Sequence, residues 1–302
     1  MRFDGRVVVV TGAGNGLGRS HALAFGGRGA KVVVNDLGGA GAGTGADTGV
    51  AESVAAEIRA AGGEAIANTD GVQDGARIIE QAMDCYGRVD VLVNNAGILR
   101  DAAFHKLTDD QWDAIYETHL LGSYRTTRAA WEPMRAAGYG RIVMTTSAAG
   151  LYGNFGQANY SAAKMGQVGL ANTLAAEGAP RGILTNTVAP IAASRLTATV
   201  MPPAVLERLD PGYVTPLVLL LCHESHQGVG EIFEVGGGWI AKVRWEQAPG
   251  AVFKRDRISP ESIAARWAEI TAFEGAAHPR SAMDSLAELS KRAGFSIALE
   301  VQ

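Results

Sequence analysis

The feature of this 302-residue chain that most constrains its fold is an apolar, mostly β-branched run that leads directly into a glycine-rich turn. The run, residues 6–11, suits a strand that is buried on both faces, as in a parallel sheet. Residues 12–18 contain four glycines, and a helical pattern follows over residues 19–28. Strand, glycine turn and helix in this order are the context of a dinucleotide-binding motif, because glycines admit a pyrophosphate and the helix N-terminus offers free N–H groups.

The alternation of apolar runs and helical patterns continues along the chain. Strands are predicted over residues 31–35, 64–68, 88–93, 140–146, 183–188 and 230–235, and helices over residues 50–61, 74–86, 109–134 and 216–221. Regular alternation of this kind indicates an α/β fold with a Rossmann-like, doubly wound parallel sheet and helices on both faces. Such a sheet binds its ligands at the carboxyl ends of the strands.

A change of pattern near residue 244 indicates two parts. Residues 1–243 are long enough for one large α/β domain that includes the catalytic site, and 47% of the whole chain is hydrophobic. Residues 244–302 hold two helix patterns, one that starts at Ser259–Pro260 and one over residues 281–293, but too few residues for an independent core. We therefore expect a C-terminal helical extension that packs at a subunit interface or over the substrate site.

Composition and termini exclude several classes of function. The net charge of -4 is opposite to the basic footprint of a nucleic-acid-binding protein. No segment reaches the roughly 20 apolar residues of a membrane span. Cys85 and Cys222 form no CxxC pair and no disulfide framework, which favours a reducing compartment. The N-terminus has no apolar signal core and the C-terminus is no Ser-Lys-Leu type address, so we expect a cytoplasmic protein.

One stretch superficially suggests a metal site. Cys222, His223, Glu224 and His226 lie close together in the sequence, directly after an apolar helix. Nothing else in the sequence completes a set of ligands. We therefore interpret these residues as a helix end with capping histidines, and we predict no metal.

Residues at the ends of the first strands predict a bound dinucleotide. Asp36 ends the second strand, 18 residues after Gly18, where an acid can hold both ribose hydroxyls and would repel a 2′-phosphate. Leu37 and Gly38 follow, so no adjacent base favours NADP, and we predict NAD. The alternative for Asp36 is a helix cap or turn residue. Asp70, near the end of the third strand, could reach an adenine edge. The other predicted cofactor contacts lie in the glycine turn and are Gly12, Asn15, Gly16, Leu17 and Gly18.

Tyr160 and Lys164, four residues apart, are candidates for acid–base chemistry. On a helix they share one face, and an ammonium close to a phenol favours the phenolate and lowers its pKa. Such a phenol can exchange a proton with a carbonyl or an alcohol. Ser147, at the end of the fifth strand, could fold back so that two hydroxyls contact one carbonyl oxygen. The alternatives are a surface Tyr–Lys pair and a serine that satisfies backbone groups.

Four ordered motifs resemble the classical short-chain dehydrogenase/reductase family. They are Thr11–Gly18, Asn94–Gly97, Ser147 and Tyr160–Lys164, and the resemblance covers about residues 4–240. It implies hydride transfer with a nicotinamide cofactor, for which the protein supplies orientation and the proton. It implies that Tyr160 is the general acid/base, that Lys164 lowers its pKa and holds the nicotinamide ribose, and that Ser147 polarises the substrate oxygen. Asn95 would line the cofactor groove.

Five further stretches are similar to one branch of this family, the (3R)-hydroxyacyl-CoA dehydrogenase unit of peroxisomal multifunctional enzyme type 2. They are residues 35–39, 95–101, 152–160, 222–225 and 238–240. The similarity implies an NAD-dependent 3-hydroxyacyl-CoA dehydrogenase of (3R) preference for β-oxidation of a fatty or steroid side chain, as a homodimer or homotetramer. We expect the unit to stand alone, with no hydratase or sterol-carrier segment after it. The alternatives are a 17β-hydroxysteroid or other secondary alcohol dehydrogenase, an NADP-dependent 3-oxoacyl carrier-protein reductase, and a non-catalytic nucleotide-sensing protein.

Some features depart from the family pattern or leave two interpretations open. His119 stands about 24 residues beyond the Asn-Ala-Gly motif, where many members place the asparagine of a proton relay. It could bridge a water there and take part in catalysis, or be a partly buried helical histidine. Pro190 and Ile191 replace a common Pro-Gly pair. Residues 196–209 lie where such enzymes carry a mobile lid whose apolar residues could contact an acyl chain or simply pack. Residues 38–49 are predicted to be a flexible surface loop.

Overall fold

The computed structural model describes residues 1–39, 41–192 and 203–295, so residues 196–202 of the predicted lid lie outside the described residues. The chain divides into two compact units, Met1–Lys242 and Val243–Gln302. The first contains every residue that the sequence predicts for cofactor binding and catalysis.

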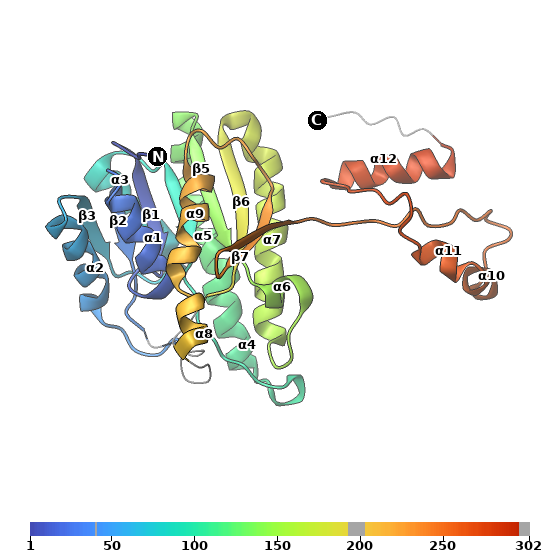
Figure 1. Ribbon diagram of the computed structural model, residues 1–302, viewed down its shortest axis with the longest axis horizontal. Coiled ribbons are helices and arrows are strands. Elements are labelled where there is room, and N and C mark those ends of the chain that lie inside the picture. The colour runs from blue at the N-terminus through green and yellow to red at the C-terminus, as the bar shows by residue number, and fades with distance from the viewer. Residues whose placement is uncertain (40, 193–202, 296–302) are drawn as a thin grey trace. The chain divides into compact units, whose positions relative to one another are not determined.

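The first unit is built on an eight-stranded sheet with the order β3-β2-β1-β4-β5-β6-β7-β8 (Figure 1). The strands are β1 Val7–Thr11, β2 Lys31–Asn35, β3 Glu64–Asn68, β4 Val91–Asn94, β5 Gly140–Thr145, β6 Ile183–Pro190, β7 Ile232–Gly236 and β8 Trp239–Val243. Each neighbouring pair from β3 to β7 is parallel. The strand order reverses between β1 and β4, which places the ligand-binding crevice at their carboxyl ends. The predicted α/β fold with a doubly wound sheet is confirmed.

Helices cover both faces of this sheet. They are α1 Gly16–Gly26, α2 Thr48–Ala60, α3 Gly75–Tyr86, α4 Asp109–Tyr116, α5 Gly122–Ala137, α6 Ala148–Tyr152, α7 Ala158–Gly178, α8 Pro203–Arg208 and α9 Thr215–Cys222. Side chains of α1, α2 and α9 pack on one face, and side chains of α3, α5 and α7 pack on the other. The sheet is therefore buried on both sides, which is why its strands are continuous apolar runs.

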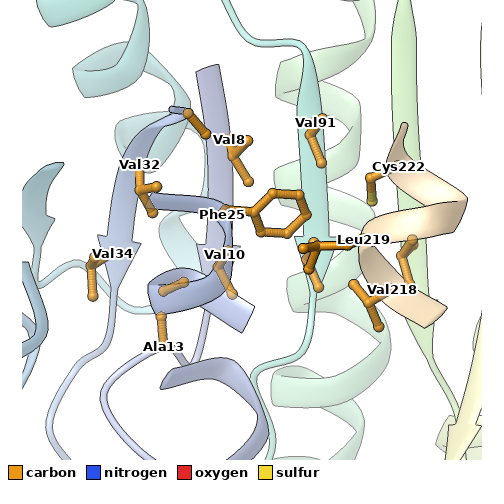
Figure 2. Close-up of a cluster of buried hydrophobic side chains, with 14 of the residues drawn as sticks. Val8, Val10, Ala13, Phe25, Val32, Val34, Val91, Val218, Leu219 and Cys222 are labelled. Carbon is orange, nitrogen blue, oxygen red and sulfur yellow. The ribbon is translucent and has the colours of Figure 1, made fainter. Parts of the chain in front are cut away.

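Strand β1 shows how the two cores are formed. Val8 and Val10 point into one core and Val7 and Val9 into the other, because successive side chains of a strand point to opposite faces. Figure 2 shows the first core, in which Phe25 of α1 and Leu219 of α9 point toward one another. This packing fixes β1, and with it the glycine turn that follows.

Three local features differ from the sequence prediction. The fourth strand starts at Val91 instead of residue 88, and the buried carboxylate of Asp90 there accepts bonds from Arg88 and from the backbone N–H of Val7. The predicted helix over residues 109–134 is α4 and α5 joined by a π-helical turn, Glu117–Leu121. Strand β8 was not predicted.

The second unit contains α10 Pro260–Ala265, α11 Trp267–Thr271 and α12 Ala282–Ala293. Ser259 and Ser281 each form a capping box, with hydrogen bonds in both directions to the third residue of the helix. The start predicted from Ser259–Pro260 is therefore confirmed, although that helix is interrupted after Ala265. Trp267 and Phe273 expose more than half of their surface. That this extension packs at a subunit interface or over the substrate site stays a prediction.

A buried histidine joins α1 to α9. The Nδ1 atom of His21 lies 2.8 Å from the Oγ1 atom of Thr215, which is also 2.7 Å from the Oγ atom of Ser20. His21 is 1% exposed, and burial lowers its pKa from the ordinary 6.5 to about 3. The folded protein therefore holds this imidazole in its neutral form.

Acid is expected to destabilise the fold through His21. Because its folded-state pKa is below the unfolded value, the unfolded chain binds the proton first, and the free energy of unfolding falls as the pH drops from about 6.5 toward about 3. One such group contributes about 1.4 kcal/mol per pH unit, or about 2 kcal/mol between pH 6.5 and 5. Urea unfolding of His21→Asn at pH 7 and pH 5 should therefore show a pH dependence that is weaker by about this amount. The exposed His105→Asn is the control, and equal pH dependence in all three proteins would contradict the prediction.

Candidate active site

The structure brings Ser147, Tyr160, Lys164 and His119 together beside the carboxyl end of β5. Ser147 is the second residue after this strand and is the N-cap of the short helix α6, where its Oγ atom accepts a bond from the backbone N–H of Ala149. Tyr160 and Lys164 lie one turn apart near the start of α7. Helix α6 turns the chain back, so that α7 begins beside the strand end. The sequence predicted this return but not the helix that makes it.

Lys164 is buried and its Nζ atom donates to the backbone carbonyl of Thr145 at 2.5 Å. The same nitrogen lies 5.5 Å from the centroid of the Tyr160 ring. Burial lowers the pKa of the Lys164 ammonium to about 7. Since the ammonium is costly in this position, a polar partner that reaches it would be bound strongly.

The phenol of Tyr160 differs from the sequence expectation. Burial raises its pKa, a hydrogen bond with Ser147 lowers it, and the charge of Asp101 raises it. The net direction is upward, whereas the sequence predicted that Lys164 would lower the pKa. The reason is that α7 packs the phenol among other side chains, and burial of the phenolate outweighs the bond from Ser147. In this geometry, Ser147 is the group that favours the phenolate.

His119 lies on the π-helical turn and is fully buried against Tyr160. The two rings meet edge to face with their centroids 5.2 Å apart. The Nε2 atom of His119 is 2.8 Å from the carbonyl oxygen of Ile98 and 3.1 Å from its amide nitrogen. Burial, and then the charge of Lys164, hold the pKa of His119 well below its usual range. The imidazole is therefore neutral, and its buried Nδ1 atom has no hydrogen-bond partner among the described residues.

Asn95 and Thr11 hold the glycine turn in place. The side-chain amide of Asn95 donates to the carbonyls of Thr11 and Gly12, and the Oγ1 atom of Thr11 accepts from the backbone N–H of Asn95. A Cβ atom on Gly18 would lie 2.1 Å from the carbonyl oxygen of Gly12. Gly12 itself has a φ of 63°, in the region that favours glycine. The turn therefore requires glycine at positions 12 and 18 for its own conformation and packing. Because these residues carry no side chain, a ligand can approach their backbone closely.

Other predicted cofactor contacts lie at the start of α1. Asn15 is its N-cap and is exposed, with no side-chain capping bond. Gly16 has open space around it, and Leu17 is half-buried. The free N–H groups of this helix start, together with an unobstructed backbone, fit a pyrophosphate.

Asp36 extends from the end of β2 to the glycine turn. Its Oδ2 atom accepts from the backbone N–H of Gly14 at 2.8 Å, and its Oδ1 atom accepts from Gly38 at 2.7 Å. The second bond is the one expected of a turn residue, and the ribose contact predicted for Asp36 stays a prediction. The carboxylate is held beside the turn with lone pairs left for hydroxyl donors.

Asp70 is also held in place, in this case by the side chains of Arg77 and Asn68. Its carboxylate pairs with Arg77 at 3.1 Å and accepts from the amide of Asn68 at 2.9 Å. It lines a cavity of about 420 Å³ on the side of β3 and α3. The adenine contact predicted for Asp70 stays a prediction.

The glycine-rich segment after β2 makes bonds that the sequence did not predict. The backbone N–H of Leu99 donates to Gly41, and the Nε atom of Arg100 donates to the carbonyl of Ala42. A Cβ atom on Gly43 would lie 2.8 Å from the side chain of Ile98. This segment thus rests on the segment after β4. The signal in the sequence is its run of glycines, which allows such close approach.

Two negative predictions bear on the class of site. Within residues 1–39, 41–192 and 203–295, no cluster of three or more His, Cys, Asp or Glu side chains could hold a metal ion. His223 is the C-cap of α9, and its Nδ1 atom lies 2.8 Å from the hydroxyl of Ser225. In the same part of the chain, no helix combines the length and the apolarity needed to cross a bilayer.

Comparison with known proteins gives a consistent result. A family model described as short chain dehydrogenase matches residues 6–202. Peroxisomal multifunctional enzyme type 2 of Mus musculus is 54% identical over 94% of this chain and 39% of its own length. A short-chain type dehydrogenase/reductase of Mycobacterium tuberculosis is 53% identical over 90% of this chain and 96% of its own length. The structure of full-length peroxisomal multifunctional enzyme type 2 from Drosophila melanogaster superposes with a TM-score of 0.84 at 40% identity, over 97% of this chain and 50% of that one.

The relatives differ from this chain in length, and their names bear on its location in the cell. The chain spans between a third and two thirds of the length of the first curated relatives that it matches. The expected cytoplasmic location is wrong, because these relatives are named as peroxisomal enzymes. The two cysteines favour a reducing compartment, but they do not distinguish one reducing compartment from another.

Proposed function

This chain belongs to the short-chain dehydrogenase family of oxidoreductases, and from that membership we propose that it oxidises the 3-hydroxyl group of (3R)-hydroxyacyl-CoA with NAD. The observation that carries the proposal is the convergence of Ser147, Tyr160 and Lys164 beside β5, next to the glycine turn that fits a pyrophosphate. We take the substrate class, 3-hydroxyacyl-CoA, from the dehydrogenase unit of the peroxisomal multifunctional enzymes to which this chain is similar.

The proposed chemistry divides between cofactor and protein. When bound, the nicotinamide accepts the hydride. Ser147 would donate a hydrogen bond to the substrate oxygen, and Tyr160 in its phenolate form would take the hydroxyl proton as the ketone forms. Lys164 would hold the nicotinamide ribose, because its buried ammonium donates to the carbonyl of Thr145 and has further N–H donors to offer. A hydroxyl of the nicotinamide ribose would be a second hydrogen-bond acceptor for the ammonium of Lys164.

We assign His119 a supporting part in this chemistry. Its ring packs against the phenol of Tyr160 and its Nε2 atom engages the backbone of Ile98. Its Nδ1 atom, which has no hydrogen-bond partner within the described part of the chain, would accept a hydrogen bond from a water molecule. A neutral imidazole of this kind would hold the phenol in place and could pass a proton toward solvent.

The preference for NAD rests on Asp36. Its two oxygens accept from Gly14 and Gly38 and face the end of the turn where the adenosine ribose would lie. A 2′-phosphate in that position would meet a carboxylate, with no guanidinium or ammonium adjacent in the sequence.

Steady-state kinetics test the proposal directly. The purified protein is assayed with (3R)- and (3S)-hydroxyacyl-CoA of short, medium and long chain, each with NAD and with NADP. Turnover of the (3R) thioesters with NAD, and little with the (3S) thioesters or NADP, is the expected result. Activity on a free steroid alcohol with no turnover of any thioester would reject the acyl-CoA assignment. Preference for NADP would favour the biosynthetic reductase instead.

We also propose that the protein is a homodimer or homotetramer. Three aromatic side chains on α4 and α5 are partly exposed to solvent. They are Trp112, which is 38% exposed, Tyr116, which is 41% exposed, and Tyr124, which is 43% exposed. The second unit exposes further aromatic side chains, such as Trp267 at 59%. Aromatic side chains are enriched at interfaces between protein chains, which supports the proposal. Light scattering of the purified chain measures the subunit number, and a monomer at micromolar concentration would contradict the proposal.

A further inference from the structure

A buried asparagine immediately precedes the catalytic tyrosine. Asn159 is 2% exposed and lies in the first turn of α7. Its Oδ1 atom accepts from the backbone N–H of Tyr160 at 2.8 Å. This N–H is one of the donors that the first turn of a helix leaves without an intrahelical partner. The oxygen of Asn159 therefore completes the start of the helix at the catalytic residue itself.

The nitrogen of the same amide faces the opposite way. Its Nδ2 atom donates to the carbonyl of Arg100 at 3.1 Å and to the carbonyl of Gln111 at 3.2 Å. Arg100 belongs to the segment after β4, and Gln111 lies in the first turn of α4. These three hydrogen bonds of the Asn159 side chain are to backbone groups, so a single planar amide holds three pieces of main chain in one arrangement.

These pieces carry the groups that surround the phenol. Ile98, which contacts the imidazole of His119, is two residues before Arg100. His119 in turn packs edge to face on Tyr160. The amide of Asn159 thus connects the two supports of the phenol, namely the backbone of Tyr160 and the segment that positions His119.

We propose that Asn159 is a positioning residue for Tyr160. Its amide fixes the start of α7 against the segment 98–101 and α4, so that the phenol keeps its place relative to Ser147 and to the substrate oxygen. This inference rests on the proposed function for the identity of the substrate only. A displacement of about 1 Å in a reacting group lowers rates by about a hundredfold, so small shifts of this junction have a large effect on turnover.

The fold is expected to survive loss of this amide. Two exposed contacts join the same segments, one from the backbone N–H of Ala102 to the carbonyl of Gly156 and one from Gln157 to Asp101. Asn159→Ser offers a hydroxyl that can cap the Tyr160 N–H but is too short to reach both carbonyls. Asn159→Asp keeps the shape and the acceptor oxygen, and replaces the donor by an oxygen that faces two carbonyls.

Asn186 on β6 provides the matched control. It is 1% exposed, its amide donates to the carbonyl of Gly228 at 2.9 Å, and its oxygen accepts from the backbone N–H of Glu231 at 3.0 Å. It therefore bridges backbone groups as Asn159 does, but it lies in the middle of β6 and contacts neither the segment 98–101 nor α4 through these bonds. Asn186→Ser should lower stability in the same way without moving the phenol.

The experiment measures kcat, KM, the dissociation constant of NAD and urea unfolding for Asn159→Ser, Asn159→Asp and Asn186→Ser. We expect kcat to fall by about tenfold to a hundredfold in both Asn159 variants, with NAD binding within about twofold of wild type, and to stay unchanged in Asn186→Ser. Hydrogen exchange over residues 98–111 should become faster in the Asn159 variants only. This readout does not depend on any substrate.

Two results would overturn the proposal. One is wild-type kcat in the Asn159 variants despite faster exchange, because the junction would then move without consequence for the phenol. The other is an equal loss of kcat in Asn186→Ser, which would show a general effect of stability. If the wild-type protein oxidises another secondary alcohol and no thioester, the proposed function fails, and the same comparison on that alcohol still decides the role of Asn159.

Discussion

Replacement of Tyr160 by phenylalanine is expected to lower kcat by about 1,000-fold. The substitution removes the only atom that exchanges the proton in the proposed reaction, and it keeps the ring that packs edge to face on His119. Folding and NAD binding should therefore stay close to wild type. The measurement is steady-state oxidation of the best substrate, together with the dissociation constant of NAD from fluorescence titration.

The control for this substitution is Tyr86→Phe. Tyr86 is half-buried at the end of α3, where Lys31 lies over its ring, and burial raises the pKa of its phenol to about 12. Loss of its hydroxyl should leave kcat unchanged. A Tyr160→Phe enzyme with kcat within about threefold of wild type would show that another group takes the proton, and would reject the mechanism.

Replacement of Asp36 by serine is expected to reduce the preference for NAD over NADP by about a hundredfold. The carboxylate would accept bonds from the ribose hydroxyls, and a charge-assisted bond of this kind is worth about 1.5–3 kcal/mol, or about tenfold to a hundredfold in affinity. The same carboxylate repels a 2′-phosphate, so its removal weakens NAD binding and permits NADP at once. The ratio of kcat/KM for the two cofactors measures both effects.

Asp47 provides the control because it makes the same type of bond in the same region. It is the exposed N-cap of α2, and its Oδ1 atom accepts from the backbone N–H of Gly49 at 2.9 Å. Serine is a good N-cap, so Asp47→Ser should preserve the helix and leave the cofactor ratio unchanged. Equal ratios in Asp36→Ser and wild type would instead assign Asp36 a purely structural part in the turn.

The sequence predicted the elements that have strong local signals. The strands predicted over residues 31–35 and 64–68 match β2 and β3 residue for residue. The cap at Ser259 was found because serine followed by proline fits the first turn of a helix and little else. The resemblance of the ordered motifs identified the family, which the comparisons confirm.

What the sequence could not predict depends on contacts between distant segments. The pKa of Tyr160 is set by burial, and burial follows from how α7 packs rather than from the spacing to Lys164. Asn159 gave no sign of its two carbonyl partners, since Arg100 and Gln111 are far from it in sequence. The bonds of the glycine-rich segment to Leu99 and Arg100 were missed for the same reason.

The π-helical turn that carries His119 also limits changes in chain length. A turn of this type holds one residue more than an α-helical turn, and each residue of an α-helix advances about 100° around the axis. Deleting one residue from Glu117–Leu121 would therefore leave one regular α-helical turn in its place, so that α4 and α5 keep their relative rotation while the bulge is lost. Trp112 and Tyr116 would keep their present faces, but His119 would leave the ring of Tyr160. Among natural sequences that keep this site, gaps in an alignment should avoid these five positions even where the residue types vary.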